Sequence, residues 1–200
     1  MAKSLNKNRM MGSKIALLIT LTVVITTRQF FADESLYHEA FELLGNFMVA
    51  ICAMGRVYST AFLGGFKNNK LVDHGVYSII RNPLYFFSLI GIAGVALISN
   101  HLVVMLGLPL FFILLYSRLI AREEGYLLEQ FGQDYIDYKK RVPALWPRFS
   151  QYRAPETTQM YPKFLNKAFL DAVWWLSALP FIEAVEYLQD LNIYRTFFAT

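Results

Sequence analysis

The sequence predicts an all-α polytopic membrane protein with four to five transmembrane helices, and three observations support this. Of the 200 residues, 56% are hydrophobic and only 17% are charged, whereas about a quarter of the residues of soluble domains are charged. Residues 82–117 contain no Asp, Glu, Lys or Arg, and the remaining charges lie in clusters between apolar segments. This composition excludes a disordered chain and a coiled coil. A single cysteine, Cys52, also excludes a disulfide-stapled secreted domain.

Two apolar segments near the N-terminus predict the first two spans. Residues 15–27 carry no charge, and because other spans follow we expect an uncleaved anchor rather than a signal peptide. Residues 43–66 are long enough to cross a bilayer and carry Arg56 near the centre. A charge at that depth costs about 2.5–3.5 kcal/mol on insertion scales. Arg56 therefore either faces a bundle or cavity, where it can pair with an acidic acceptor, or extends to the interface.

The charge-free stretch predicts a helical hairpin. As a single helix, its 36 residues would extend roughly 54 Å, well beyond a hydrocarbon core of about 30 Å. The polar pair Asn100-His101 lies near the middle and suits a turn. We therefore expect one arm at residues 84–99 and the returning arm at residues 102–117.

A last apolar segment, residues 164–188, holds Trp174 and Trp175 but is interrupted by Asp171, Pro180 and Glu183. It fits a short fifth span and a helix lying in the interface equally well. Both interpretations stay open.

Charges in the connecting segments orient the spans. Residues 1–14 contain four Lys or Arg and no acid, residues 29–42 contain four Asp or Glu and no Lys or Arg, and residues 118–153 contain seven Lys or Arg. The positive-inside rule then places the N-terminus and residues 118–153 in the cytoplasm. We expect a multi-pass protein of a bacterial inner membrane or of the endoplasmic reticulum, depending on the host.

This topology accounts for the net charge of +4 without nucleic-acid binding, for which a basic patch in a recognisable motif is missing. The sequence also lacks a Gly-rich phosphate loop. The histidines His38, His74 and His101 lie on different segments, so we expect no metal site.

Two polar segments flank the hairpin on the cytoplasmic side. In the first, Asn82 suits an N-cap and Pro83 the first turn of the next helix. The second, residues 122–143, repeats apolar and aromatic residues at helical spacing, which is typical of an amphipathic helix. Helix initiation and surface amphipathicity do not explain Glu123-Glu124 at the end of a span. Acids are unfavourable there unless Arg118, Arg122 or a cationic ligand compensates them.

An ordered set of short motifs runs through both segments: Leu71-Val72, Gly75-Val76-Tyr77, Arg81-Asn82-Pro83-Leu84-Tyr85, Glu123-Glu124, Phe131-Gly132, Tyr135, Tyr138 and Arg141-Val142-Pro143. Over residues 69–148 the chain resembles the isoprenylcysteine carboxyl methyltransferase family and the related phospholipid N-methyltransferases. The resemblance implies an integral membrane enzyme that binds S-adenosylmethionine at a cytoplasmic-side pocket. It implies methylation of a lipophilic small molecule, lipid or prenylated acceptor. We accordingly divide the chain into an N-terminal helix pair (1–66), a methyltransferase core (67–150) and a C-terminal extension (151–200).

Carried over by position, the resemblance also implies the cofactor-binding residues. These are Asn69, Lys70, Leu71, Val72 and Tyr77 in the loop, Asn82, Pro83, Leu84 and Tyr85 at the start of the hairpin, and the acid Glu123. Two positions depart from the family pattern. Asn82 stands where the family has His, and Leu119 stands where it has an acceptor-binding Arg, with Arg118 about 100° away round the helix.

Methyl transfer from a sulfonium needs proximity and alignment more than acid–base groups. Aromatic faces and a nearby carboxylate suit the sulfonium. An amine or phenol acceptor would need a base, for which Glu124 or Tyr135 is available, whereas Arg56 and Arg118 can pair with an acidic acceptor. Glu124, Arg56 and Arg118 are therefore the candidate catalytic residues.

Two alternatives remain: a membrane reductase of the sterol type that uses NADPH, and a non-catalytic scaffold of the same fold. The Glu123-Glu124 pair opposes the extra phosphate of NADPH electrostatically. The identity of the acceptor and the oligomeric state stay open.

Overall fold

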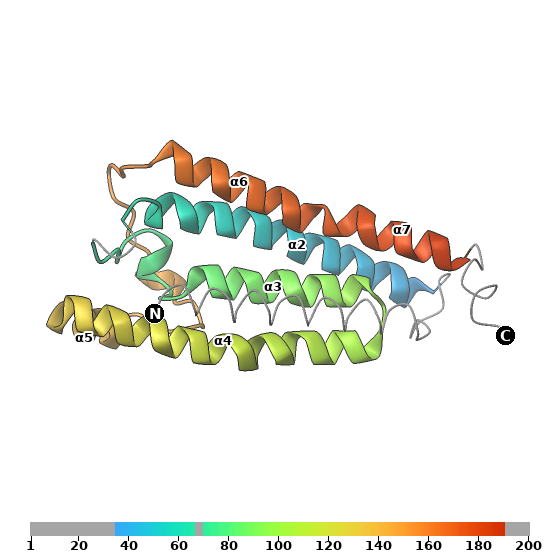
Figure 1. Ribbon diagram of the computed structural model, residues 1–200, viewed down its shortest axis with the longest axis horizontal. Coiled ribbons are helices and arrows are strands. Elements are labelled where there is room, and N and C mark those ends of the chain that lie inside the picture. The colour runs from blue at the N-terminus through green and yellow to red at the C-terminus, as the bar shows by residue number, and fades with distance from the viewer. Residues whose placement is uncertain (1–34, 67–69, 191–200) are drawn as a thin grey trace. The chain divides into compact units, whose positions relative to one another are not determined.

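The computed structural model describes residues 35–66 and 70–190, and this part of the chain is all-α (Figure 1). Its regular elements are helices apart from one isolated β-bridge, between Gly75 and Arg153. In chain order they are α2 (Leu36–Leu63), η1 (Val76–Ser78), α3 (Pro83–Ile98), α4 (Leu102–Phe131), α5 (Gln133–Arg141), η2 (Phe149–Gln151), α6 (Pro162–Leu176) and α7 (Ala178–Asp190).

Two of these helices are long and apolar enough to cross a membrane. The most apolar stretches of α2 and α4 have mean hydropathies of 1.4 and 2.2, and only 28% and 11% of those stretches are buried inside the protein. The core helix of a soluble protein would be mostly buried, so both helices present apolar side chains to their surroundings. Helix α3 is apolar but shorter, with 16 residues. The predicted span at residues 15–27 lies outside the described residues, and the number and orientation of the spans stay predictions.

The predicted hairpin turn is confirmed. Helix α3 ends at Ile98 and α4 begins at Leu102. Between them Asn100 is buried in the left-handed conformation, with φ 49°. Its side-chain Nδ2 lies 2.8 Å from Nδ1 of His38 on α2, so the turn is held to a second helix.

The predicted end of the second arm, at residue 117, is wrong. Helix α4 continues to Phe131, because residues 118–131 are mostly strong helix formers such as Leu, Ala, Arg and Glu. The helix predicted for residues 122–143 is instead broken at Gly132, which has φ 52° and precedes α5. Glycine adopts that backbone angle without a Cβ clash.

The last apolar segment forms two helices rather than one. Helix α6 has 15 residues and α7 has 13, and Pro180 lies in the first turn of α7, where its missing N–H costs no hydrogen bond. Neither helix reaches the length of a candidate span.

The chain divides into two compact units, which are described separately. Of the described residues, unit 1 comprises 35–49, 92–115 and 177–190, and unit 2 comprises 50–66, 70–91 and 116–176. In unit 1, α2 and α3 approach closely, since a Cβ at Gly45 would lie 2.7 Å from the carbonyl oxygen of Gly94. All the predicted site residues that the structure describes fall within unit 2. The division predicted at residues 66 and 150 stays a prediction.

Candidate functional site

Glu124 joins three segments of unit 2. Its carboxylate lies 3.1 Å from Nη2 of Arg81, which precedes α3, and 3.0 Å from Nζ of Lys139 on α5. Asn82 Nδ2 also donates to Glu124 Oε1 at 3.4 Å. Arg81 and Glu124 are 9% and 12% exposed, so this is a mostly buried ion pair.

These contacts explain how an acid is accommodated beside a predicted span. Glu124 lies within α4 rather than at its end, and Arg81 and Lys139 compensate it. The compensation expected from Arg118 and Arg122 does not occur at Glu124, and both arginines are exposed. Sequence reasoning missed Arg81 and Lys139 as partners because nothing local marks a pairing between separate helices.

Asn82 starts α3 as predicted. Its carbonyl oxygen accepts the backbone N–H groups of Tyr85 and Phe86. Its side chain, however, is turned toward the site, where Nδ2 donates to Glu124 and to the carbonyl of Ala144. The following Pro83 is fully buried.

Buried tyrosines connect the loop before α3 with α5. Tyr138 Oη donates to the carbonyl of Tyr77 at 2.8 Å. Burial, then the neighbouring Tyr138 and Glu123, raise the pKa of Tyr77. Within the described residues the hydroxyl of Tyr77 is buried without a hydrogen-bond partner. Burial, and then Glu124, raise the pKa of Tyr135 to about 12, so its hydroxyl is protonated at neutral pH.

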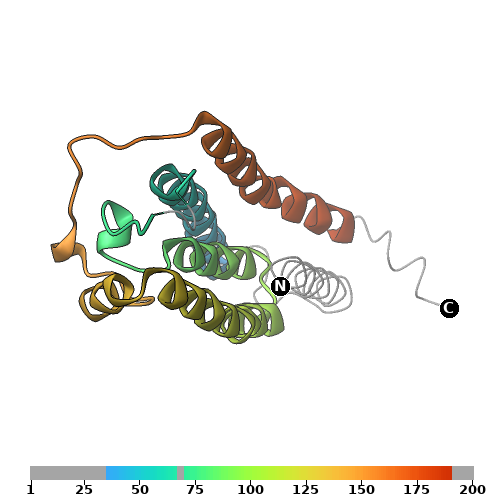
Figure 2. The same ribbon diagram turned by 60° about the vertical axis from the view of Figure 1, so that its left-hand side comes forward.

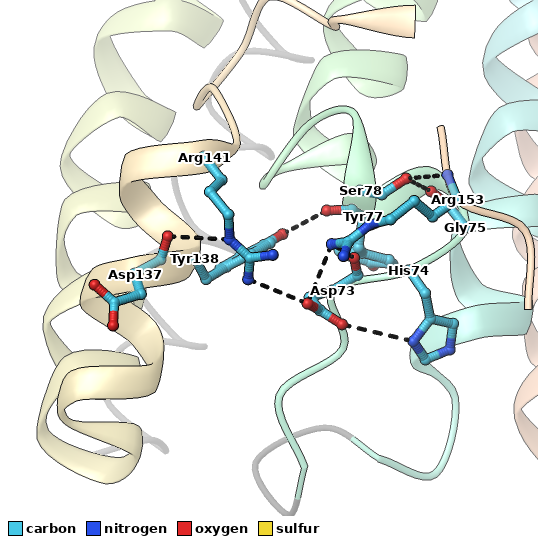
Figure 3. A network of polar contacts seen from close by, with 9 residues as sticks. All are labelled: Asp73, His74, Gly75, Tyr77, Ser78, Asp137, Tyr138, Arg141 and Arg153. Atoms are coloured by element: carbon cyan, nitrogen blue, oxygen red, sulfur yellow. Dashed lines mark hydrogen bonds and ion pairs between the residues drawn. The ribbon is translucent and has the colours of Figure 1, made fainter. Parts of the chain in front are cut away.

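The loop before η1 is fixed by a polar network around Asp73 (Figure 3). Asp73 Oδ2 lies 3.3 Å from Nη2 of Arg141 on α5 and 3.2 Å from Nη2 of Arg153. The backbone of Arg153 also bonds to the loop and to η1. Its carbonyl accepts the Gly75 N–H at 2.8 Å, and its N–H donates to the side-chain Oγ of Ser78 at 2.9 Å. The loop thus has a defined conformation set by two later segments.

Several predicted cofactor residues come together around this loop. Leu71 packs against the cluster of Tyr135, Tyr138 and Val142, and Val72 and Tyr77 belong to a second buried cluster that begins at Phe62.

The other predicted cofactor residues are placed differently. Lys70 is exposed, with Nζ 6.0 Å from the ring of Phe66. The ring of Tyr85 packs against Tyr116 at 5.2 Å. Asn69 lies outside the described residues.

Arg56 pairs with Asp171, the acid that interrupts the last apolar segment of the sequence. Its guanidinium lies 2.6 Å from Asp171 Oδ2 on α6 and donates to Ser88 Oγ and, at 3.5 Å, to the carbonyl of Leu84 on α3. The ring of Trp175 lies 5.8 Å away. In the structure the acidic partner of Arg56 is therefore Asp171. The predicted pairing of Arg56 with an acidic acceptor stays a prediction.

A cleft of about 520 Å³ opens between the C-terminal part of α4 and α5. Its lining residues are Ala121, Glu124, Gly125, Leu128, Tyr135, Ile136, Lys139 and Lys140. Of the predicted site residues only Glu124 lines it, so the cleft does not coincide with the Tyr77 loop. Among the described residues no three His, Cys, Asp or Glu gather as a metal-ion site.

Comparison with known proteins identifies the family. Residues 41–134 match the model of the phospholipid methyltransferase family. The chain is 33% identical over 152 residues to the cobalt-zinc-cadmium resistance protein CzcN of Cupriavidus metallidurans, covering 76% of this chain and 70% of that protein. It is 28% identical over 193 residues to the nickel-cobalt-cadmium resistance protein NccN of Alcaligenes xylosoxydans xylosoxydans, covering 96% and 90%.

Two enzymes are similar to this chain over a shorter stretch. The protein-S-isoprenylcysteine O-methyltransferase of Schizosaccharomyces pombe is 33% identical over 78 residues, which is 39% of this chain and 33% of that protein. The corresponding enzyme B of Arabidopsis thaliana is 32% identical over 78 residues, 39% of this chain and 40% of that protein. Together with the apolar helices, these similarities show that the chain belongs to the isoprenylcysteine carboxyl methyltransferase and phospholipid methyltransferase family of membrane proteins.

Proposed function

We propose that this protein is an S-adenosylmethionine-dependent methyltransferase that acts on a lipophilic acceptor in the membrane. The observation that carries the proposal is the contact between the two polar segments that flank the hairpin and carry the family resemblance. Tyr138 bonds to the backbone of Tyr77, and Asn82 and Arg81 bond to Glu124. Residues far apart in the sequence thus form one site in unit 2.

The residues present fit the cofactor. The buried hydroxyl of Tyr77 lacks a partner among the described residues, and Glu123 is near enough to influence its pKa. A carboxylate beside an aromatic ring suits a cationic ligand. S-adenosylmethionine, when bound, supplies an electrophilic methyl group on a positive sulfur. We infer that Glu123 and Tyr77 bind it and that Asn82 orients it from the start of α3.

Glu124 has a different role in this proposal. Its oxygens already accept from Arg81, Lys139 and Asn82, so it orders these groups rather than receiving a proton. Tyr135 is protonated at neutral pH and is no base either. This arrangement favours an acceptor that needs no base, such as a carboxylate or a thiolate, over an amine.

Calorimetric titration of the purified protein in nanodiscs tests the cofactor. We expect saturable binding of S-adenosylmethionine, no binding of NADPH, and about a tenfold or greater loss of affinity in Glu123→Gln, as for removal of a charge-assisted hydrogen bond. Glu129→Gln, an exposed acid further along α4, is the matched control. Binding of NADPH alone would identify a reductase instead.

The acceptor class is tested with labelled methyl donor and lipid extracts. We expect label in an alkali-labile ester or a thioether rather than in methylated phosphatidylethanolamine. Label in the amine lipid would contradict the inference that no base is needed.

The names of two relatives suggest the cellular setting. Both CzcN and NccN are called metal resistance proteins, and we propose that methylation by this chain also supports growth in toxic divalent metals. Deletion of the gene should lower tolerance of cobalt, zinc or cadmium, and Glu123→Gln should fail to restore it. Full rescue by that variant would separate the resistance role from methyl transfer.

A further inference from the structure

One surface of unit 2 is both aromatic and basic. The connector between α5 and α6, the orange chain of Figure 2, exposes 82% of Trp146 and 72% of Phe149, and Leu145 beside them is exposed as well. Large apolar side chains gathered on an exposed connector mark an interaction surface.

The basic residues around them are incompletely neutralised. Residues 139–155 contain five Lys or Arg and no Asp or Glu. Asp73 is shared by Arg141 and Arg153, Glu124 is shared by Lys139 and Arg81, and Asp137 pairs with Lys140. Five cations thus share three carboxylates. Within the part of the chain that the structure describes, Arg148 has no carboxylate partner, so the surface carries excess positive charge.

Backbone hydrogen bonds fix the level of this surface relative to an apolar helix. The Arg81 N–H donates to the carbonyl of Pro143 at 2.9 Å, and the Arg148 N–H donates to the carbonyl of Ile79 at 3.0 Å. Both ends of residues 143–148 are therefore attached to the chain just before α3, a charge-free apolar helix that begins at Pro83. Trp146 lies between these two attachments in the chain, and therefore near the N-terminal end of α3.

We propose that residues 139–149 together with Arg153, here called the basic aromatic surface, bind the headgroup region of an anionic phospholipid bilayer. Trp and Phe favour the boundary between hydrocarbon and headgroups. Lys and Arg at that level attract anionic lipids. A protein partner would not require the surface to lie at the end of an apolar helix, whereas a bilayer does. The inference needs the membrane setting of α3 but does not rest on methyl transfer.

Tryptophan fluorescence in nanodiscs tests this binding. The chain has three tryptophans, so Trp174→Phe with Trp175→Phe leaves Trp146 as the only reporter. We expect lipids brominated near the headgroup end of the acyl chain to quench Trp146 more strongly than lipids brominated near the terminal methyl. Adding phosphatidylserine to phosphatidylcholine should increase this quenching about twofold, and high salt should reverse the increase.

Two control comparisons separate charge from exposure. Arg148→Gln should reduce the effect of phosphatidylserine, whereas Lys163→Gln, an exposed lysine outside the surface, should leave it unchanged. With Trp174 as the only reporter, quenching should not depend on phosphatidylserine.

Three results would overturn the proposal. Quenching of Trp146 by aqueous iodide but not by brominated lipid would place the surface in water. Equal quenching with and without phosphatidylserine would rule out selection of anionic lipid. Protection from both quenchers would show that a protein covers the surface.

Discussion

Glu124 is the residue on which the candidate site depends most directly, because one carboxylate neutralises two cations from different segments. Glu124→Gln keeps the shape of the side chain and removes its charge, which leaves the mostly buried Arg81 uncompensated. Breaking a buried pair costs about 3–5 kcal/mol, and since Lys139 is 54% exposed we expect a loss near the lower end of that range.

Denaturation in detergent measures this effect. The midpoint of unfolding should fall clearly for Glu124→Gln and stay within error for Glu129→Gln, an exposed acid on the same helix. Equal midpoints for the two variants would show that the ion pair contributes no net stability.

At the scale of elements, Gly132 breaks the helix that the sequence predicts over residues 122–143. Its φ of 52° costs a residue with a Cβ about 1–2 kcal/mol, so Gly132→Ala should destabilise the protein or straighten the junction of α4 and α5. Gly125→Ala is the matched control, because that glycine lies inside α4 with open space around it. It should be neutral or stabilise by up to about 1 kcal/mol. Thermal unfolding of both variants checks the difference, and an equal response would show that the backbone angle at 132 is unimportant.

The loop before η1 gives a second prediction at this scale. Asp73 is partly exposed and holds Arg141 and Arg153, so Asp73→Asn should cost less than about 1 kcal/mol of global stability. It should nevertheless release the loop, which hydrogen exchange would detect as faster exchange of the Gly75 and Ser78 amides. If the proposed cofactor site is correct, affinity for S-adenosylmethionine falls as well.

Asp137→Asn provides the comparison for that experiment. Asp137 is an exposed acid of α5 that pairs with Lys140 on the same helix, so its loss should leave exchange in the loop unchanged. Unchanged exchange in Asp73→Asn too would mean that the backbone bonds of Arg153 alone hold the loop.

Local sequence signals predicted some of these elements and not others. The all-helical class follows from the length of the charge-free segment, residues 82–117, and the turn follows from the polar pair Asn100-His101 within it. Both signals are local in the sequence. The end of α4 cannot be predicted in this way. Helix-forming residues continue beyond residue 117, and helical periodicity does not distinguish a membrane span from a helix that continues outside the membrane. The pairs of Arg56 with Asp171 and of Arg81 with Glu124 join distant segments, and a single sequence carries no signal for such contacts. The family resemblance supplied the loop residues, and the structure added the groups that fix them.

On the scale of the whole molecule, the contacts of α6 bear on how the chain sits in the bilayer. Three contacts join the C-terminal end of α2 to α6 and the residues just before it. As the residue number falls on the α2 side, it rises on the α6 side. The ring of Tyr161 fills the space that a Cβ at Gly65 would need, a Cβ at Gly64 would lie 2.9 Å from Cβ of Phe164, and Arg56 pairs with Asp171. Helix α6 therefore lies antiparallel beside the C-terminal half of α2, which is a candidate span. This favours α6 within the hydrocarbon over α6 in the interface, because its one acid, Asp171, has a cationic partner there.

Cysteine accessibility tests this placement together with the predicted orientation. In a Cys52→Ala background, Leu170→Cys on α6 and Met160→Cys just before it each introduce a thiol at an exposed position, 67% and 47% exposed in the protein alone. An impermeant maleimide needs an ionised thiol in water. We therefore expect it to label residue 160 from the cytoplasmic side only and residue 170 only after detergent is added. Labelling of residue 170 in intact vesicles would show that α6 lies in the interface. Labelling of residue 160 from the outside would contradict the topology that the charge distribution predicts.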